Sequence, residues 1–121
     1  MKVVKIGLVL GLTAAATAAT AMPAFMKVFQ ETYTPAKDST ITTAKCALCH
    51  MPKSVKLNPY GLDIKQALED AKVKVVTPDI LKKVEPLDSD KDGYTNIEEI
   101  QADTLPGDPA SHPASHAAAT K

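Results

Sequence analysis

Apolar residues recur at helical spacing along much of the chain. Phe25, Phe29 and Tyr33 are spaced four residues apart and predict a short amphipathic helix within residues 22–37, which Pro35 ends. The run 73–76 has strand-like residues and is interpreted as a connection. Apolar spacing and capping residues predict further helices. These run from Ser39 or Thr40 to residues 46–50, from Leu62 to about Lys72, from Thr77 to before Pro86, and from about Ile97 to Ala102.

The first 21 residues have the pattern of a secretory signal peptide. Lys2 and Lys5 precede an apolar stretch over 6–19, and residues 19–21 read Ala-Thr-Ala, an A-x-A cleavage pattern. The stretch is too short for a comfortable membrane span, so we expect cleavage after Ala21 and a periplasmic or secreted protein, with an uncleaved anchor as the alternative. The mature chain then forms one small domain over residues 22–110 and a tail, 111–121, whose Pro, Ala and Ser content predicts disorder.

Composition limits the size of the hydrophobic core, and charge limits the kinds of partner that the chain can bind. The chain has no Trp, two Phe and three Tyr, so few large apolar groups are available for a core. The formal net charge is zero, but residues 22–84 hold ten lysines against six acidic residues, and residues 85–121 hold two against eight. There is no arginine, which together with the expected export argues against binding to nucleic acid.

Residues 46–50 carry the most specific chemical signature of the chain. They read Cys-Ala-Leu-Cys-His, the C-x-x-C-H pattern for covalent attachment of c-type haem. On one helical turn Cys46 and Cys49 face the same side, so both thiols can form thioether bonds to the haem vinyl groups. His50 can then bind the iron as the proximal ligand. The motif therefore predicts one covalent haem c.

Other interpretations of the cysteine pair fit the sequence less well. A thioredoxin-type pair needs a strand–turn–helix setting, and no such pattern precedes Cys46. A structural zinc site needs four ligands, which the cysteine pair, His50 and two tail histidines supply only awkwardly. A disulfide between Cys46 and Cys49 would close a very small loop and stabilise little. These three alternatives stay open at the level of the sequence.

A second motif, residues 88–99, matches the EF-hand calcium loop D-x-D-x-D-G-x5-E. Gly93 allows the sharp turn that this loop makes at its sixth position. Only one such loop is present, Pro86 prevents a continuous helix from entering it, and Thr95 replaces the usual apolar residue at the eighth position. We therefore expect a structural Ca²⁺ ion rather than a sensor. The expected ligands are Asp88, Asp90, Asp92, the backbone carbonyl of Tyr94, Asn96 directly or through water, and a bidentate Glu99.

The second axial ligand of the iron is not evident from the sequence. No methionine follows Met51, which is too close to His50 to reach the opposite face of a haem. His112 and His116 lie in the tail, and His112 is favoured of the two because it is nearer the folded part. Met22 or Met26 from the N-terminal segment, a lysine, or an open site are the other candidates.

Three segments together resemble a known family. The motif Cys46–His50, the loop Leu57–Gly61, and residues 88–99 followed by Pro106–Pro109 resemble small secreted bacterial monohaem cytochrome c-like proteins with a C-terminal calcium loop. The resemblance covers most of residues 25–110. It implies an all-α, cytochrome c-like helical domain packed around one covalent haem, with the calcium loop as a C-terminal extension. It also implies a periplasmic protein that passes one electron at a time, with thioether bonds at Cys46 and Cys49 and with His50 as proximal ligand.

We therefore expect an electron carrier rather than an enzyme. Lys45, Lys53, Lys56 and Lys65 surround the motif in sequence and would steer acidic redox partner proteins, although ordinary surface lysines are an equally good interpretation. Two other functions stay open. One is a haem protein with an open distal site that binds small ligands or acts like a peroxidase. The other is a non-haem, calcium-stabilised binding module in which the two cysteines form a disulfide.

Overall fold

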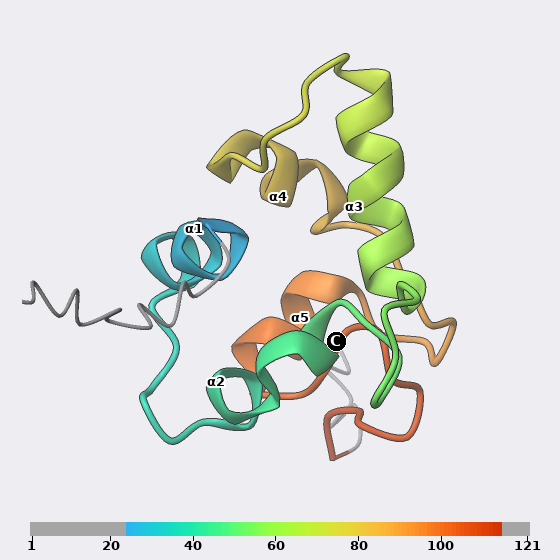
Figure 1. The fold of residues 1–121 in the computed structure, drawn as a ribbon. Coiled ribbons are helices and arrows are strands. Elements are labelled where there is room, and N and C mark those ends of the chain that lie inside the picture. The colour runs from blue at the N-terminus through green and yellow to red at the C-terminus, as the bar shows by residue number, and fades with distance from the viewer. Residues whose placement is uncertain (1–23, 115–121) are drawn as a thin grey trace, which may run out of the picture.

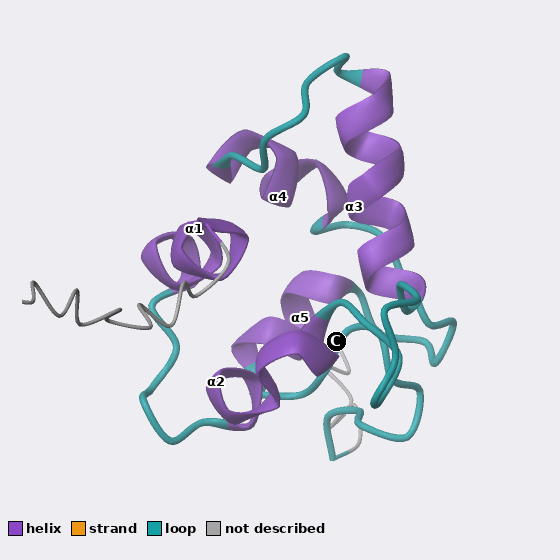
Figure 2. Ribbon diagram, in the orientation of Figure 1, coloured by secondary structure: helices purple, strands orange, loops and turns teal. Residues whose placement is uncertain are grey.

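Residues 24–114, which the computed structural model describes, form helices, turns and loops without a strand in that range (Figure 2). One isolated antiparallel bridge joins His50 and Leu57. The fold is therefore all-α, as predicted. The elements are α1 (Ala24–Tyr33), α2 (Thr40–Ala44), the 3₁₀ turn η1 (Lys45–Leu48), α3 (Pro59–Asp70), α4 (Pro78–Val84) and α5 (Asn96–Gln101), shown in Figure 1.

Some parts of the chain that carry predictions lie outside the described residues. These are the predicted signal peptide at 1–21, Met22, and residues 115–121 of the predicted tail, including His116. Among the described residues, no helix is both long enough and apolar enough to cross a membrane.

Capping side chains mark the start of four helices, α2 to α5. The Thr77 hydroxyl accepts a hydrogen bond from the Ile80 amide, and Pro78 follows as the first helical residue, as predicted. Thr95 and Glu98 form a capping box at the start of α5. The predicted start of α3 at Leu62 is wrong, because the Asn58 side chain caps the helix and Pro59 occupies its first position.

The helix predicted to run from residues 39 or 40 into the motif is two short pieces. Ser39 caps α2 as expected, but Lys45 has φ of +50°, which an α-helix does not allow. The chain therefore restarts at Lys45 as the 3₁₀ turn η1, which carries the first three motif residues. The motif therefore begins on this separate 3₁₀ turn rather than on α2.

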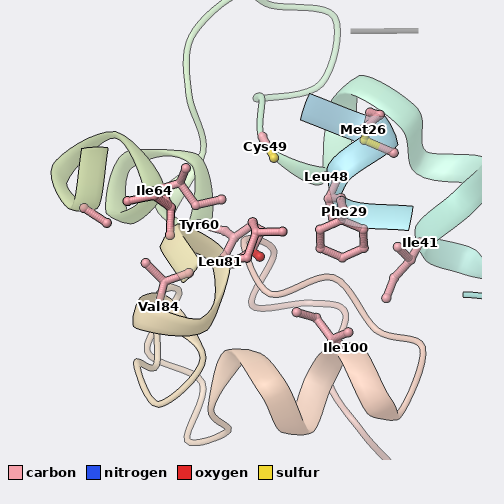
Figure 3. Close-up of a cluster of buried hydrophobic side chains, with 12 residues drawn as sticks. Met26, Phe29, Ile41, Leu48, Cys49, Tyr60, Ile64, Leu81, Val84 and Ile100 are labelled. Carbon is pink, nitrogen blue, oxygen red and sulfur yellow. The ribbon is translucent and has the colours of Figure 1, made fainter. Parts of the chain in front are cut away.

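Side chains from every helix meet in one buried cluster (Figure 3). Phe29 of α1 and Tyr60 of α3 are its largest members, and both are fully buried. α4 packs against both α1 and α3. The aliphatic part of the cluster consists of Ile41, Leu48, Ile64, Ile80, Leu81, Val84 and Ile100. This cluster holds α1, η1 and α3 in place around the cavity described next.

Candidate haem and calcium sites

An apolar cavity of about 320 Å³ lies between α1, the motif segment and α3. Its size falls at the lower end of the range of small-molecule and cofactor pockets, roughly 300–1,000 Å³. Three motif residues, Cys46, Cys49 and His50, line it. The other lining residues are Phe25, Met26, Lys45, Leu57, Gly61, Ile64, Lys65, Leu68 and Val76. The motif therefore opens onto an apolar cavity.

The two cysteines are unpaired and lie on one turn of chain. The amides of Cys49 and His50 both donate to the Cys46 carbonyl, at 3.2 and 2.9 Å. On a 3₁₀ turn, side chains three residues apart lie directly above one another. This turn can therefore place both thiols on one side, as was predicted for an α-helical turn. Cys46 is exposed and Cys49 is buried.

The buried thiol is held in its neutral form. Burial, followed by the neighbouring Cys46, raises the pKa of Cys49 to about 12. Thiol–disulfide exchange and zinc ligation both use a thiolate, and reactive pairs lower the pKa of one cysteine. The local electrostatics are thus opposite to those of a thioredoxin-type pair.

His50 is oriented by a backbone contact. Its Nδ1 lies 3.0 Å from the carbonyl oxygen of Val55. The chain returns to Val55 because residues 51–57 fold back on the motif: the Met51 amide donates to the Lys56 carbonyl at 2.8 Å, and the Asn58 amide donates to the Cys49 carbonyl at 2.9 Å. A metal-binding histidine typically donates its second ring N–H to such an acceptor, which fixes the tautomer and presents Nε2 to the metal.

Asn58 ties the motif to α3. It is buried, and its amide group donates to the carbonyl oxygens of Ala47 and Leu48 at 3.2 and 3.1 Å while its Oδ1 accepts from the Gly61 amide at 2.9 Å. Gly61 lies so close to the motif that a Cβ there would collide with the carbonyl oxygen of Cys49. From the sequence, residues Leu57–Gly61 were interpreted as a loop and as part of the family resemblance. The Asn-Pro pair, an N-cap followed by a first-turn proline, was the available signal for this helix start.

These residues fit a covalent haem. The cavity is lined by apolar side chains, two thiols stand at its edge on one turn, and an imidazole is held with Nδ1 bonded to a carbonyl. A flat apolar macrocycle needs this combination of apolar walls, thioether sites and one nitrogen ligand.

The carboxylates of the second motif gather at one point. Asp88, Asp90 and Asp92 each offer an oxygen atom within 4.8 Å of the others. The amides of Asp92 and Gly93 donate to the two carboxylate oxygens of Asp88, at 3.2 and 3.0 Å. Gly93 has φ of +99°, a conformation that side chains rarely adopt, as expected at the sixth loop position.

Glu99 supplies the buried acidic group of this loop. It has no exposed surface, and neither of its carboxylate oxygens has a hydrogen-bond partner; the Oδ2 atoms of Asp90 and Asp92 are likewise buried and unpaired. Burial, then repulsion from Asp90, Asp92 and Asp88, raises the pKa of Glu99 to about 8. Burial and the charge on Asp92 raise the pKa of Asp90 to about 6. A divalent cation would compensate all of these unpaired charges, so the residues fit the predicted ion.

The Asn96 side chain makes three hydrogen bonds within the protein. Its amide nitrogen donates to the Val84 carbonyl at 2.7 Å and to the Ser89 hydroxyl at 2.8 Å, and its Oδ1 accepts from the Ser89 amide at 3.3 Å. Both polar atoms of the side chain are therefore used to fasten the loop to α4. The ligand roles of Asn96, direct or through water, and of the Tyr94 carbonyl stay predictions.

His112 is not brought together with the haem motif. Its ring stacks in parallel on that of Tyr94, with centroids 6.2 Å apart, and it does not line the cavity. Two of the predicted lysines, Lys45 and Lys65, do line the cavity, and Lys65 forms an ion pair with Glu69 at 2.9 Å. Met26, one of the minor candidates of the sequence analysis, lines the cavity as well.

Comparison with known proteins adds no assignment. No protein-family model, no curated protein and no solved structure matches this chain. The function is therefore argued from the two sites themselves.

Proposed function

We propose that this chain is a periplasmic or secreted one-electron carrier that holds a single c-type haem in the cavity beside residues 46–50. One observation carries the proposal: two free thiols and an imidazole oriented by a backbone carbonyl share one apolar cavity. The class of protein is that of the small monohaem cytochrome c-like proteins that the sequence resembles.

Each residue of this site has a distinct task. Cys46 and Cys49 would form the two thioether bonds that keep the cofactor attached. His50, oriented through the Val55 carbonyl, would bind the iron through Nε2. Apolar walls such as Ile64 and Leu68 exclude water. The bound haem supplies the chemistry, which is reversible one-electron exchange at iron with an external donor and acceptor.

The same proposal gives the calcium loop a structural task. Asp88, Asp90, Asp92 and Glu99 would bind one Ca²⁺ together with the Tyr94 carbonyl. The observation that supports this site is the set of buried, unpaired carboxylate oxygens around it. Binding would remove their mutual repulsion and fix α5 against the rest of the domain.

The proposal is tested by expressing the full chain with export and haem-attachment machinery and recording its visible spectrum, oxidised and reduced. Sharp bands on reduction and a mass increase that survives denaturation are expected. His50→Ala should change the spectrum and lower the attached fraction, whereas the matched control Val55→Ala keeps the backbone acceptor of His50 and should leave both unchanged. A wild-type chain that carries no covalent haem would refute the proposal and favour the non-haem binding module. Broad high-spin bands would instead favour the open-site haem protein.

A further inference from the structure

We propose that the sulfur atom of Met26 would bind the haem iron as its second protein ligand, in addition to His50. This inference rests on the proposed haem function. It differs from the usual arrangement of single-haem cytochromes c, because here the ligand would precede the attachment motif in the sequence.

Met26 borders the cavity in which the haem would lie. It lies on α1 and is 7 % exposed, and it lines the same cavity as Cys46, Cys49 and His50. Figure 3 shows Met26 on α1 and Cys49 on the motif segment, at the edge of the same buried cluster. The cavity is thus lined by a thioether and an imidazole that come from elements separate in the sequence.

The position of α1 is fixed independently of any cofactor. Phe29, one turn after Met26, is fully buried in the core. The ring of Tyr33 packs on that of Phe29 with centroids 4.8 Å apart, and its hydroxyl donates to the Glu85 carboxylate at 3.0 Å. Because α1 is anchored in this way, Met26 is held at the cavity without a loop having to close over it.

The other candidate ligands of the described residues are less suitable. Lys65 is paired with Glu69, and Lys45 directly precedes Cys46 on the motif side. Either amine would have to lose a proton to bind iron, whereas a thioether carries none. Met51 is 46 % exposed and His112 stacks on Tyr94, and neither lines the cavity.

A methionine in the apolar wall of a cavity can also be a plain packing residue, and the test must separate the two roles. Met26→Leu keeps the apolar volume but removes the sulfur, and Met26→His replaces the sulfur by a nitrogen ligand. Met51→Leu is the matched control, because it removes a methionine that does not line the cavity. The readouts are the weak red charge-transfer band of sulfur-ligated ferric haem, the strongly shifted methyl resonance of a bound methionine, and the reduction potential.

The wild type and Met51→Leu should show the band and the shifted methyl resonance. Met26→Leu should lose both, and Met26→His should lose both and lower the potential, because methionine ligation raises the potential relative to histidine. If Met26→Leu retains the band, or if the wild type carries covalent haem without it, the ligand is not Met26. A chain without covalent haem would instead refute the proposed function, which makes the two failures distinguishable.

Discussion

Gly61 lies where α3 passes closest to the motif, and the contact determines which residue fits. In most helices, replacing glycine with alanine is stabilising, by up to about 1 kcal/mol. Here the added methyl group would meet the Cys49 carbonyl, which is backbone and is itself bonded by the Asn58 amide. The carbonyl cannot turn away without breaking that hydrogen bond. The effect of a Gly61→Ala substitution on stability therefore measures how tightly α3 holds the motif.

We predict that Gly61→Ala lowers the free energy of unfolding by about 1–3 kcal/mol, the usual cost of overpacking. The measurement is denaturant unfolding of the purified full chain. Leu62→Ala is the neighbouring control, since Leu62 is exposed. A Gly61→Ala variant as stable as the wild type would show that α3 can move away from the motif at no cost.

Within the proposed calcium loop, Glu99 is the residue whose charge we expect to affect stability and calcium binding most. It is buried without a partner and lies among three aspartates. We predict that Glu99→Gln stabilises the calcium-free protein at neutral pH. Folding raises the pKa of Glu99 to about 8, so the folded chain must take up a proton there, whereas glutamine is neutral in both states. The same variant should lose most of the increase in melting temperature that calcium gives the wild type.

Glu98→Gln is the control for this experiment. Glu98 accepts from the Thr95 amide and hydroxyl in the capping box, and glutamine can keep that role. It should therefore respond to calcium like the wild type. An unchanged calcium response in Glu99→Gln would remove Glu99 from the ligand set.

At the scale of elements, the acidic loop and α5 each carry a carboxyl group whose charge is disfavoured in the folded protein, Asp90 and Glu99. Asp90 and Glu99 have pKa values raised to about 6 and about 8, above the values expected in an unfolded chain. Between the unfolded and folded pKa values the unfolded chain loses its protons first, so rising pH favours unfolding.

We therefore predict that without calcium the free energy of unfolding is highest near pH 4 and falls as the pH rises toward about 8. Saturating calcium should remove the part of this fall that comes from Asp90 and Glu99, because the ion stabilises their charged forms. Unfolding curves across this range, with chelator and with calcium, provide the measurement. A stability that rises with pH in chelator would contradict the prediction.

At the scale of the whole molecule, residues that follow α5 hold the segments around Cys46–His50 in place. Asp103, just after α5, accepts from the Thr40 and Ile41 amides at 2.8 and 3.1 Å and so holds the first turn of α2. Gly107 packs against the side chain of Asn58, which holds the carbonyls of Ala47 and Leu48. The two proposed sites are thus joined by a short chain of contacts.

We predict that Asp103→Ala lowers the free energy of unfolding by about 0.5–2 kcal/mol, the typical loss for removing a capping acceptor. Faster hydrogen exchange is expected at Thr40 and Ile41, and Asp103→Asn, which keeps one acceptor oxygen, should lie between wild type and alanine. Protection at these amides that is unchanged in Asp103→Ala would show that α2 is held by its other contacts.

Local signals in the sequence were enough for several features. Thr77 and Pro78 predicted the start of α4, and the spacing of the acidic residues from Asp88 to Glu99 predicted the acidic cluster. Both signals lie within a short stretch of neighbouring residues, so they can be recognised without the tertiary structure. The break at Lys45 and the early start of α3 were missed. Lys45 takes a positive φ that its residue type does not favour, and the Asn58 cap was hidden in a segment interpreted as a loop.

The sequence by itself determined the chemistry that the chain can hold: two thiols next to an imidazole, and a loop of carboxylates around a glycine turn. Only the tertiary structure decided what surrounds them. In the structure, Met26 lines the cavity and His112 stacks on Tyr94. Asn96 donates a hydrogen bond to α4, and Asp103 accepts one from α2. The physical reason is that these contacts join residues far apart in the chain, and such pairs are fixed by how the helices pack rather than by the residues beside them.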